Sequence, residues 1–225
     1  MPSNNVFRWL DGAGWMIFSG GATDDDTIRA QALGKLAADG GVAYVTLSGD
    51  AESGERALED MEDLGAPSGY IVDVTTEDDA SIRQKLAEAG MVVIESGRSA
   101  DAVRSSLFGA GIDGIQVAYE NGAVVLAEGN SAMVFGAWVT MESGELKDGF
   151  EWLTSALIAP GVTNAAEWAK DLLQSQPSAF AVGIGAGSAL GLGSAGEIEI
   201  WGDGQVTVAL GAQYTMSDGG NNNQP

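Results

Sequence analysis

Short apolar runs, each closed by small polar residues, recur along most of the chain. The run "WMIF", for example, is followed at once by Ser19-Gly20-Gly21. A continuous apolar run bounded by turn residues is typical of a strand that is buried on both faces. The pattern predicts strands at 15–18, 42–47, 70–74, 91–94, 123–127 and 179–184.

Amphipathic segments lie between these runs at 25–38, 52–64 and 78–89. Leu58, Met61 and Leu64 share one face of the second segment, and Ile82 and Leu86 share one face of the third. Acidic residues open the third segment, where they suit the helix dipole. Strands that alternate with helices predict parallel βαβ units, so we expect an α/β fold with a layered, mostly parallel sheet flanked by helices.

The end of the chain has a different pattern. Residues 195–210 alternate between apolar and polar positions around Gly202-Asp203-Gly204, which predicts a C-terminal β-hairpin at one edge of the sheet. The residues after 212 are polar and rich in Gly and Asn, which is typical of a flexible tail. We therefore expect an N-terminal arm at 1–13, a single domain at 14–212 that includes the hairpin, and a flexible tail at 213–225.

The charge is strongly one-sided, with 32 acidic and 10 basic residues and a net charge of −22. This charge argues against nucleic acid and against anionic membrane surfaces as partners. It leaves open solubility by self-repulsion, a high-salt habitat, or a cationic peptide or protein partner. No apolar stretch reaches the roughly 18 residues of a membrane span, and no secretory signal is evident, so we expect a cytoplasmic protein.

The chain contains neither cysteine nor histidine. This excludes disulfides, thiolate nucleophiles and metal sites built on these residues, and it removes the usual general base. The acidic run at 23–27 has the oxygen ligands of a Ca²⁺ or Mg²⁺ site, but it also suits the start of a helix, which is the reading we favour. We expect no cofactor and no metal.

Ser131 is the candidate nucleophile. It follows the predicted strand at 123–127 and would lie at the carboxyl edge of the sheet, where sites in open α/β folds occur. A nucleophile elbow reads G-x-S-x-G; here Gly129 is present and Met133 replaces the last glycine. The alternative is a serine that caps a helix starting at Ala132.

Several further segments occur in a recognisable order: "GWMIFSGGATDDDTI", "VAYVTLSGD", "YENGAVVLAEGNSAMVFGA" and "SAFAVGIGAGSALGL". Across most of residues 14–210 the chain resembles the cyanophycinase and dipeptidase E family of serine peptidases. The resemblance implies a class I glutamine-amidotransferase-like fold. It also implies that Ser131 is the nucleophile and that the backbone N–H groups of Gly97 and Ala132 form the oxyanion hole.

The sequence departs from this family at the residues that carry the chemistry. The family's histidine would fall near Ala159, but the chain has no histidine, and Gly185-Ala186 replace an Asp-Glu pair. Glu95 and Arg98 also change a Gly-Gly-Asp turn. The residues left as substitute bases are Lys147, Lys170, Glu128 and Glu151.

These departures predict a catalytically inactive, peptidase-like protein with a structural, self-assembly or binding role, and we expect a homo-oligomer. Large apolar residues at 135–162 and six tryptophans are either core residues or interface anchors. The alternative is an active serine hydrolase that cleaves small or Asp/Arg-containing peptides with a base other than histidine. A metal- or salt-dependent surface protein is a third class, supported by charge alone.

Overall fold

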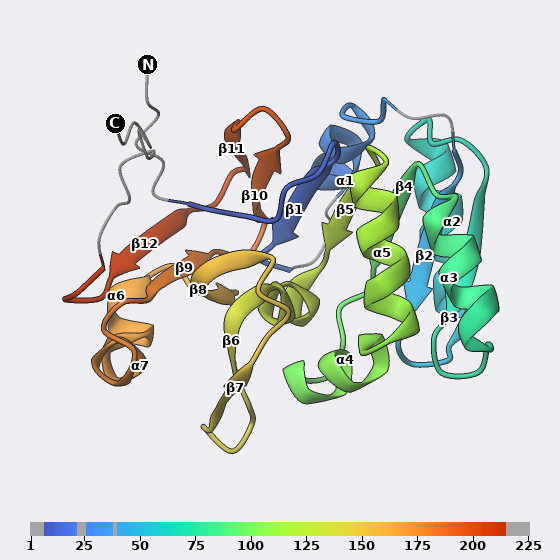
Figure 1. Ribbon diagram of the computed structural model, residues 1–225. Coiled ribbons are helices and arrows are strands. Elements are labelled where there is room, and N and C mark those ends of the chain that lie inside the picture. The colour runs from blue at the N-terminus through green and yellow to red at the C-terminus, as the bar shows by residue number, and fades with distance from the viewer. Residues whose placement is uncertain (1–6, 22–25, 38–39, 215–225) are drawn as a thin grey trace, which may run out of the picture.

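The computed structural model describes residues 7–21, 26–37 and 40–214. Its larger sheet has seven strands in the order β11-β10-β1-β5-β4-β2-β3, as Figure 1 shows. The five strands from β1 to β3 are parallel to one another. β10 runs antiparallel to its neighbour β1, and β11 runs antiparallel to β10. The strands are β1 (Trp15–Ser19), β2 (Val42–Thr46), β3 (Gly69–Asp73), β4 (Met91–Ile94), β5 (Val124–Ala127), β10 (Ser188–Gly193) and β11 (Ile198–Gly202).

Helices cover both faces of this sheet. One face packs against α1 (Asp26–Leu33) and α2 (Ala51–Asp63). The other packs against α3 (Asp79–Ala87), α4 (Ala100–Leu107) and α5 (Ala110–Glu120). Polar side chains define where three of these helices begin, because Asp50, Asp78 and Ser99 each accept a backbone N–H of the first turn.

A second sheet has five strands in the order β12-β9-β8-β6-β7. Its strands are β6 (Gly136–Thr140), β7 (Leu146–Asp148), β8 (Leu153–Pro160), β9 (Phe180–Ile184) and β12 (Val206–Leu210). The short helices α6 (Ala165–Trp168) and α7 (Lys170–Ser175) pack on its outer face. A 3₁₀ helix, η1 (Gly129–Phe135), connects β5 of the first sheet to β6 of the second.

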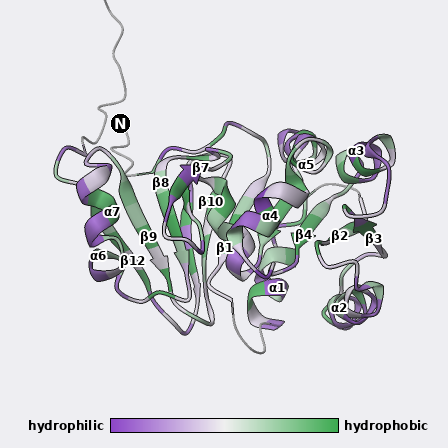
Figure 2. Cartoon of the chain, turned by 90° about the horizontal axis from the view of Figure 1, so that it is seen from below, coloured by the Kyte–Doolittle hydropathy of each residue, from purple (hydrophilic) through white to green (hydrophobic). Residues whose placement is uncertain are grey.

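The inner faces of the two sheets share one apolar core. Met16 and Phe18 of β1 belong to it together with Phe180 and Val182 of β9. Figure 2 shows the strands as largely green bands, whereas the helices around them carry purple stretches. All six tryptophans are buried or half-buried, so they serve mainly as packing residues. The expected α/β fold with a mostly parallel sheet flanked by helices is confirmed.

The predicted hairpin at 195–210 is wrong in its pairing. β11 pairs with β10 in the first sheet, whereas β12 pairs with β9 in the second. The C-terminal hairpin is therefore β10–β11, at 188–202, and β12 ends the other sheet. Both strands alternate as expected, but the segment around Gly202, which has a φ of 82°, carries the chain from one sheet to the other.

The ends of the described chain are tied to the second sheet. In the predicted arm, Leu10 donates its N–H to the carbonyl of Trp152, and the Phe7 ring packs against Phe180. In the predicted tail, the Tyr214 ring packs edge-on against the same Phe180 ring. The rest of that tail, 215–225, lies outside the described residues, as do positions 23–25 of the acidic run.

Candidate functional site

The carboxyl ends of the parallel strands meet at one edge of the larger sheet. The loops after β1, β2, β4 and β5 gather there because the four strands are parallel neighbours or next neighbours. The loop after β5 leads into η1, which contains Ser131, and the loop after β4 contains Gly97. The topology therefore brings together the residues that the resemblance assigns to nucleophile and oxyanion hole.

Ser131 does not have the backbone of a nucleophile elbow. The left-handed conformation falls on Gly129, with a φ of 52°, and among described non-glycine residues only Glu151 and Ser155 have a positive φ. Ser131 does not cap a helix either: η1 begins at Gly129 and its N-cap is Glu128. The expected helix from Ala132 is also wrong, because η1 ends at Phe135 and the chain continues as strand β6.

The Ser131 side chain is used inside the protein. It is 0% exposed, its hydroxyl donates to the carbonyl of Glu95 at 2.5 Å, and it accepts the N–H of Gly97 at 3.3 Å. The N–H predicted to stabilise an oxyanion is thus directed at the serine itself. Ala132, the other predicted donor, is fully buried within η1. No side chain of the described residues is hydrogen-bonded to the Ser131 hydroxyl.

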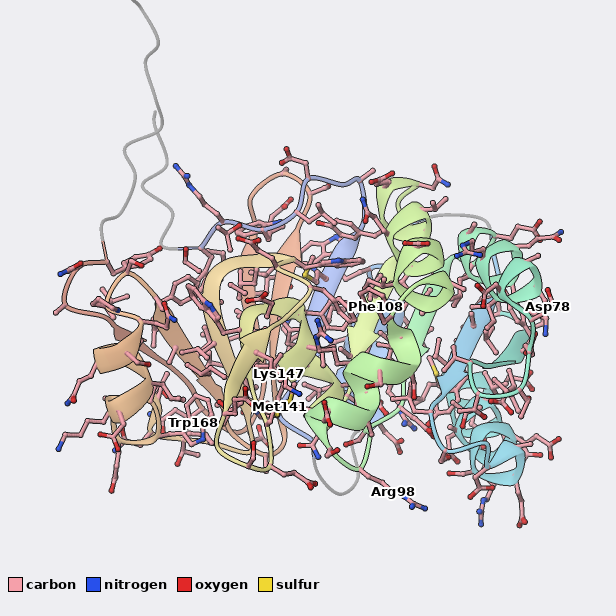
Figure 3. The ribbon with its side chains drawn as sticks, turned by 60° about the horizontal axis from the view of Figure 1, so that its bottom comes forward. Asp78, Arg98, Phe108, Met141, Lys147 and Trp168 are labelled. Carbon is pink, nitrogen blue, oxygen red and sulfur yellow. The ribbon has the colours of Figure 1, made fainter. Side chains whose placement is uncertain are left out.

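Two of the four candidate bases are engaged elsewhere. Glu128 forms a two-pronged ion pair with Arg29 of α1, at 2.8 and 3.0 Å, in which both side chains are largely buried. Burial lowers the pKa of Arg29, but the hydrogen bond and charge of Glu128 outweigh it and raise the pKa overall. Lys147 lies on the projecting β6–β7 hairpin, near Met141 in Figure 3, and pairs with Asp101 at 3.8 Å.

The other two candidate bases, Lys170 and Glu151, are exposed to solvent. Lys170 opens α7 on the outer face of the second sheet. Glu151 precedes β8 and has the positive φ noted above. Neither is hydrogen-bonded to Ser131, so none of the four candidates is placed to accept its proton.

The segments expected to carry the rest of a triad are closely packed. Ala159 lies inside β8, paired with Gly183 and 1% exposed, so a histidine side chain there would have to enter the core. A side chain at Gly185 would meet Thr163 and the backbone of Gln205. A side chain at Gly20 would run into the carbonyl of Gly185. The backbone at these strand ends is therefore packed too closely to hold the larger side chains of a catalytic triad.

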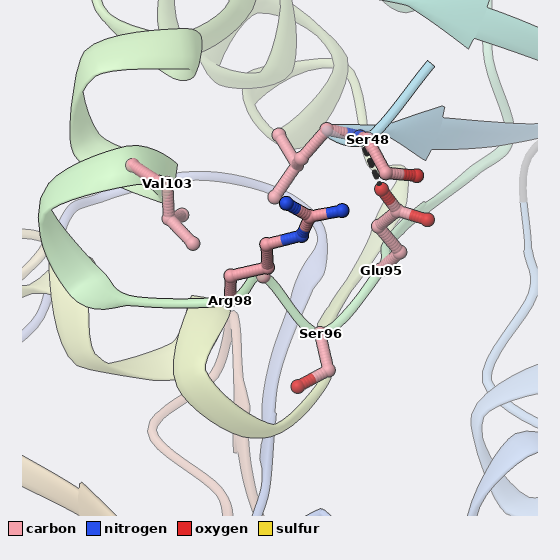
Figure 4. A pocket seen from close by; sticks show the side chains of 8 residues that line it. Ser48, Glu95, Ser96, Arg98 and Val103 are labelled. Atoms are coloured by element: carbon pink, nitrogen blue, oxygen red, sulfur yellow. Dashed lines mark hydrogen bonds between the residues drawn. The ribbon is translucent and has the colours of Figure 1, made fainter. Parts of the chain in front are cut away.

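A pocket of about 310 Å³ opens beside Ser131, at the ends of β2 and β4 and the first turns of α4 (Figure 4). Its lining is part apolar and part polar: Leu47, Ser48, Glu95, Ser96, Gly97, Arg98, Ala102 and Val103. Of these, Gly97 connects the pocket to the Ser131 hydroxyl through its N–H. The pocket is therefore a neighbour of the predicted catalytic serine, although Ser131 does not line it.

Glu95 is fixed in this pocket by three donors that converge on its Oε1 atom. They are the Thr46 hydroxyl at 3.1 Å, the Ser48 N–H at 2.7 Å and the Leu47 N–H. Arg98, by contrast, is exposed and forms no ion pair with any described residue. Figure 4 shows its guanidinium extending over the pocket toward Ser48 and Glu95.

Sequence reasoning treated Glu95 and Arg98 only as departures from a family turn and missed them as pocket residues. The sequence could have pointed to them, because Glu95 and Arg98 follow the buried strand at 91–94, at the edge of the sheet where α/β folds place their binding sites. For metals, no group of three or more acidic residues in the described part of the chain could hold an ion. Likewise, none of its helices is long and apolar enough to cross a membrane.

No family model matches this sequence, and no curated protein matches it. Similar solved structures do exist. A peptidase from an acI-B1 Actinobacterium has a TM-score of 0.73 and 15% identity, over 91% of this chain and 95% of that one. A protein assigned as peptidase E from Listeria monocytogenes EGD-e has a TM-score of 0.62 and 14% identity, over 84% of this chain and 98% of that one. The chain thus has a peptidase-like α/β fold, consistent with the class I glutamine-amidotransferase-like fold.

Proposed function

We propose that this chain is a catalytically inactive protein on a serine-peptidase fold, and that it binds a small ligand rather than cleaving a peptide. The observation that carries this proposal is the state of Ser131. Its hydroxyl is 0% exposed and is hydrogen-bonded to the carbonyl of Glu95 and the N–H of Gly97. A serine nucleophile needs an adjacent base and access to substrate, and this one has neither.

The missing base and the occupied oxyanion donor act together. Loss of the base of a catalytic triad leaves roughly 10³–10⁴-fold catalysis over water, and that remainder comes from binding and the oxyanion hole. Here the Gly97 N–H points at Ser131, so it would have to change partner before it could stabilise a developing oxyanion. Both contributions to catalysis, the general base and the oxyanion hole, are therefore lost or weakened.

The binding role is supported by the pocket beside Ser131. Its volume of about 310 Å³ is at the small end of the range for ligand sites, and it combines an apolar wall with convergent charged and hydroxyl groups. Nothing in its lining requires a chemical step. A fold that keeps a polar pocket next to an unavailable serine suits recognition better than hydrolysis.

The test of inactivity is labelling with a fluorophosphonate probe, together with a panel of Asp- and Arg-containing dipeptides. We expect no labelling of the wild-type chain and no dipeptide cleavage above that of Ser131→Ala. Stoichiometric labelling that disappears in Ser131→Ala would overturn the proposal and support the serine-hydrolase alternative.

We also propose that the chain associates with a second copy of itself through its edge strands. Four aliphatic side chains are 40–59% exposed there: Ile198, Ile200, Val208 and Leu210. They lie opposite the buried residues Leu192, Leu190, Val182 and Phe180, so they extend the core to the surface.

The local charge favours these two edge strands, β11 and β12, as the contact between copies. β12 carries no charged residue, and the one carboxylate of β11, Glu199, is paired with Lys35 at 2.6 Å. In a chain of net charge −22, two copies repel each other least where the local charge is balanced. Edge strands with exposed apolar side chains are also prone to pair with another chain.

A further inference from the structure

The pocket beside Ser131 holds one fixed negative charge. Three donors hold Oε1 of Glu95 at the end of β2, and its Oε2 has no hydrogen-bond partner among the described residues. A carboxylate oxygen at a pocket wall is an acceptor for a ligand's cationic donor. The fixed geometry also lowers the conformational cost of using it.

The same pocket holds one available positive charge. Six other basic side chains in the described chain pair with carboxylates: Arg29, Lys35, Arg56, Arg83, Lys85 and Lys147. Arg98 lines the pocket and forms no such pair, although 32 acidic residues are present in the chain. A guanidinium presents a planar fork of donors that matches a carboxylate.

The remaining wall is apolar. Leu47, Ala102 and Val103 line it; Leu47 is half-buried and Ala102 is exposed, whereas Val103 lies fully buried behind them. In Figure 4 Val103 lies on one side of the Arg98 side chain, with Ser48 and Glu95 on the other. The pocket therefore offers an anion, a cation and an aliphatic surface within about 310 Å³.

We propose that this pocket binds a free α-amino acid with an aliphatic side chain. Arg98 would hold the α-carboxylate, Oε2 of Glu95 would accept from the α-ammonium group, and the side chain would pack on Leu47 and Ala102. The inference rests on the proposed binding role and names its ligand class. No bond is made or broken, because the ligand is only held.

Other ligand classes fit this lining less well. A phosphate or dicarboxylate would bring a second negative charge beside Glu95, in a chain of net charge −22. A simple amine would leave Arg98 without an ion-pair partner, and a simple carboxylate would leave Oε2 of Glu95 without a hydrogen-bond donor. A zwitterion satisfies both charges at once.

Isothermal titration calorimetry of the full chain with L-leucine is the test. Two half-ligands accompany it: isocaproate, which lacks the ammonium group, and isopentylamine, which lacks the carboxylate. We expect leucine to bind and each half-ligand to bind at least about tenfold more weakly, since a charged hydrogen bond is lost in each.

Two pocket variants and two controls identify the site. Glu95→Gln keeps a carbonyl oxygen for the three donors but removes the charge, and Arg98→Met removes the cation. Each should weaken leucine binding at least about tenfold. Glu55→Gln and Arg56→Met make the same changes at exposed positions on α2 and should leave the affinity unchanged. Circular dichroism of each variant checks that it is folded.

The inference is overturned if leucine does not bind, or if it binds both pocket variants as tightly as the wild type. Succinate and inorganic phosphate are titrated in parallel. Binding of either one that depends on Arg98, without leucine binding, would overturn the amino-acid assignment and leave the proposed binding role in place. If no compound binds, the binding role fails too, whereas inactivity is judged separately by the labelling experiment.

Discussion

At the scale of single residues, Ser131 joins two segments of backbone. Its hydroxyl connects the Glu95 carbonyl and the Gly97 N–H, both in the loop after β4, to the start of η1 after β5. Neighbouring parallel strands are thereby tied together at the edge where the pocket opens. The serine that resembles a nucleophile by position thus has a structural use that requires it to be buried.

This use predicts a stability cost for Ser131→Ala. The change leaves the half-buried Glu95 carbonyl and Gly97 N–H without this partner, and such losses cost about 1–3 kcal/mol where water does not replace the lost bond. Urea unfolding of both proteins measures the difference. Ser105→Ala, at an exposed position on α4, should change the free energy of unfolding by less than about 0.5 kcal/mol. Equal stability of Ser131→Ala and wild type would show that the two hydrogen bonds do not stabilise the folded protein.

Sequence reasoning located this site but not its conformation. The strand pattern predicted Ser131 at the carboxyl edge of the sheet, and the resemblance added Gly97; the two residues do lie together at that edge. The run "AMVFGAWV" contains no polar residue, so nothing in it marks the end of η1 at Phe135 or the start of β6 at Gly136. Burial of the serine depends on long-range packing between η1 and β8, which local periodicity does not report.

At the scale of elements, a small charged and aromatic cluster holds β11 against the turn that follows α1. Lys35, in the turn after α1, pairs with Glu199 at 2.6 Å, and its ammonium lies 4.0 Å from the ring centroid of Trp15. The indole N–H of Trp201 donates to the other carboxylate oxygen of Glu199 at 2.8 Å. The hydrogen bonds from Lys35 and then Trp201 lower the pKa of Glu199 below its ordinary value of 4.5.

This lowered pKa predicts how Glu199→Gln depends on pH. The unfolded chain takes up a proton at Glu199 near 4.5, before the folded chain does, so the carboxylate stabilises the fold fully above that pH and less as pH falls through the lowered pKa. Urea unfolding should show Glu199→Gln less stable than wild type by about 0.5–1 kcal/mol at pH 7, a range that allows for solvent screening of the pair. The difference in the free energy of unfolding between the two proteins should become smaller toward about pH 3.

Glu55→Gln is the control, because Glu55 is exposed on α2 and forms no ion pair with a described residue. It should match the wild type closely at both pH values. A gap for Glu199→Gln that stays constant from pH 7 to about pH 3 would mean that its carboxylate charge does not hold β11 in place.

The same elements show why the predicted hairpin failed. Residues 198–202 and 206–210 both alternate, and both became strands, so period and turn residues predicted their existence. Their partners depend on what each buried side chain packs against: Trp201 stacks on Trp15 in the first sheet, whereas Ala209 packs against the α6 face of the second. The local alternation is the same whether the two strands pair with each other or join separate sheets, so only tertiary contacts decide between these pairings.

At the scale of the whole molecule, net charge and apolar edges oppose each other. A net charge of −22 repels other copies, whereas association would bury the exposed aliphatic side chains of the two edge strands, Ile198, Ile200, Val208 and Leu210. Salt screens the repulsion, with a Debye length of about 10 Å at 0.1 M and about 3 Å at 1 M, and it leaves apolar burial in place. Association should therefore strengthen as salt increases.

Sedimentation velocity across a salt series tests this balance. We expect a defined oligomer at high salt and a larger monomer fraction at low salt. Val208→Lys should reduce association, because a lysine on an apolar edge strand opposes pairing. The substitution also makes the net charge less negative, which by itself favours association. Any loss of oligomer therefore comes from the edge and not from repulsion.

Val117→Lys is the matched control. Val117 is 42% exposed on α5 and Val208 is 43% exposed on β12, so the two variants add the same charge at equally exposed valines. Association of Val117→Lys should equal or exceed that of the wild type. A wild-type monomer at every salt and protein concentration would overturn self-association, and an equal loss in both variants would place the contact away from β12.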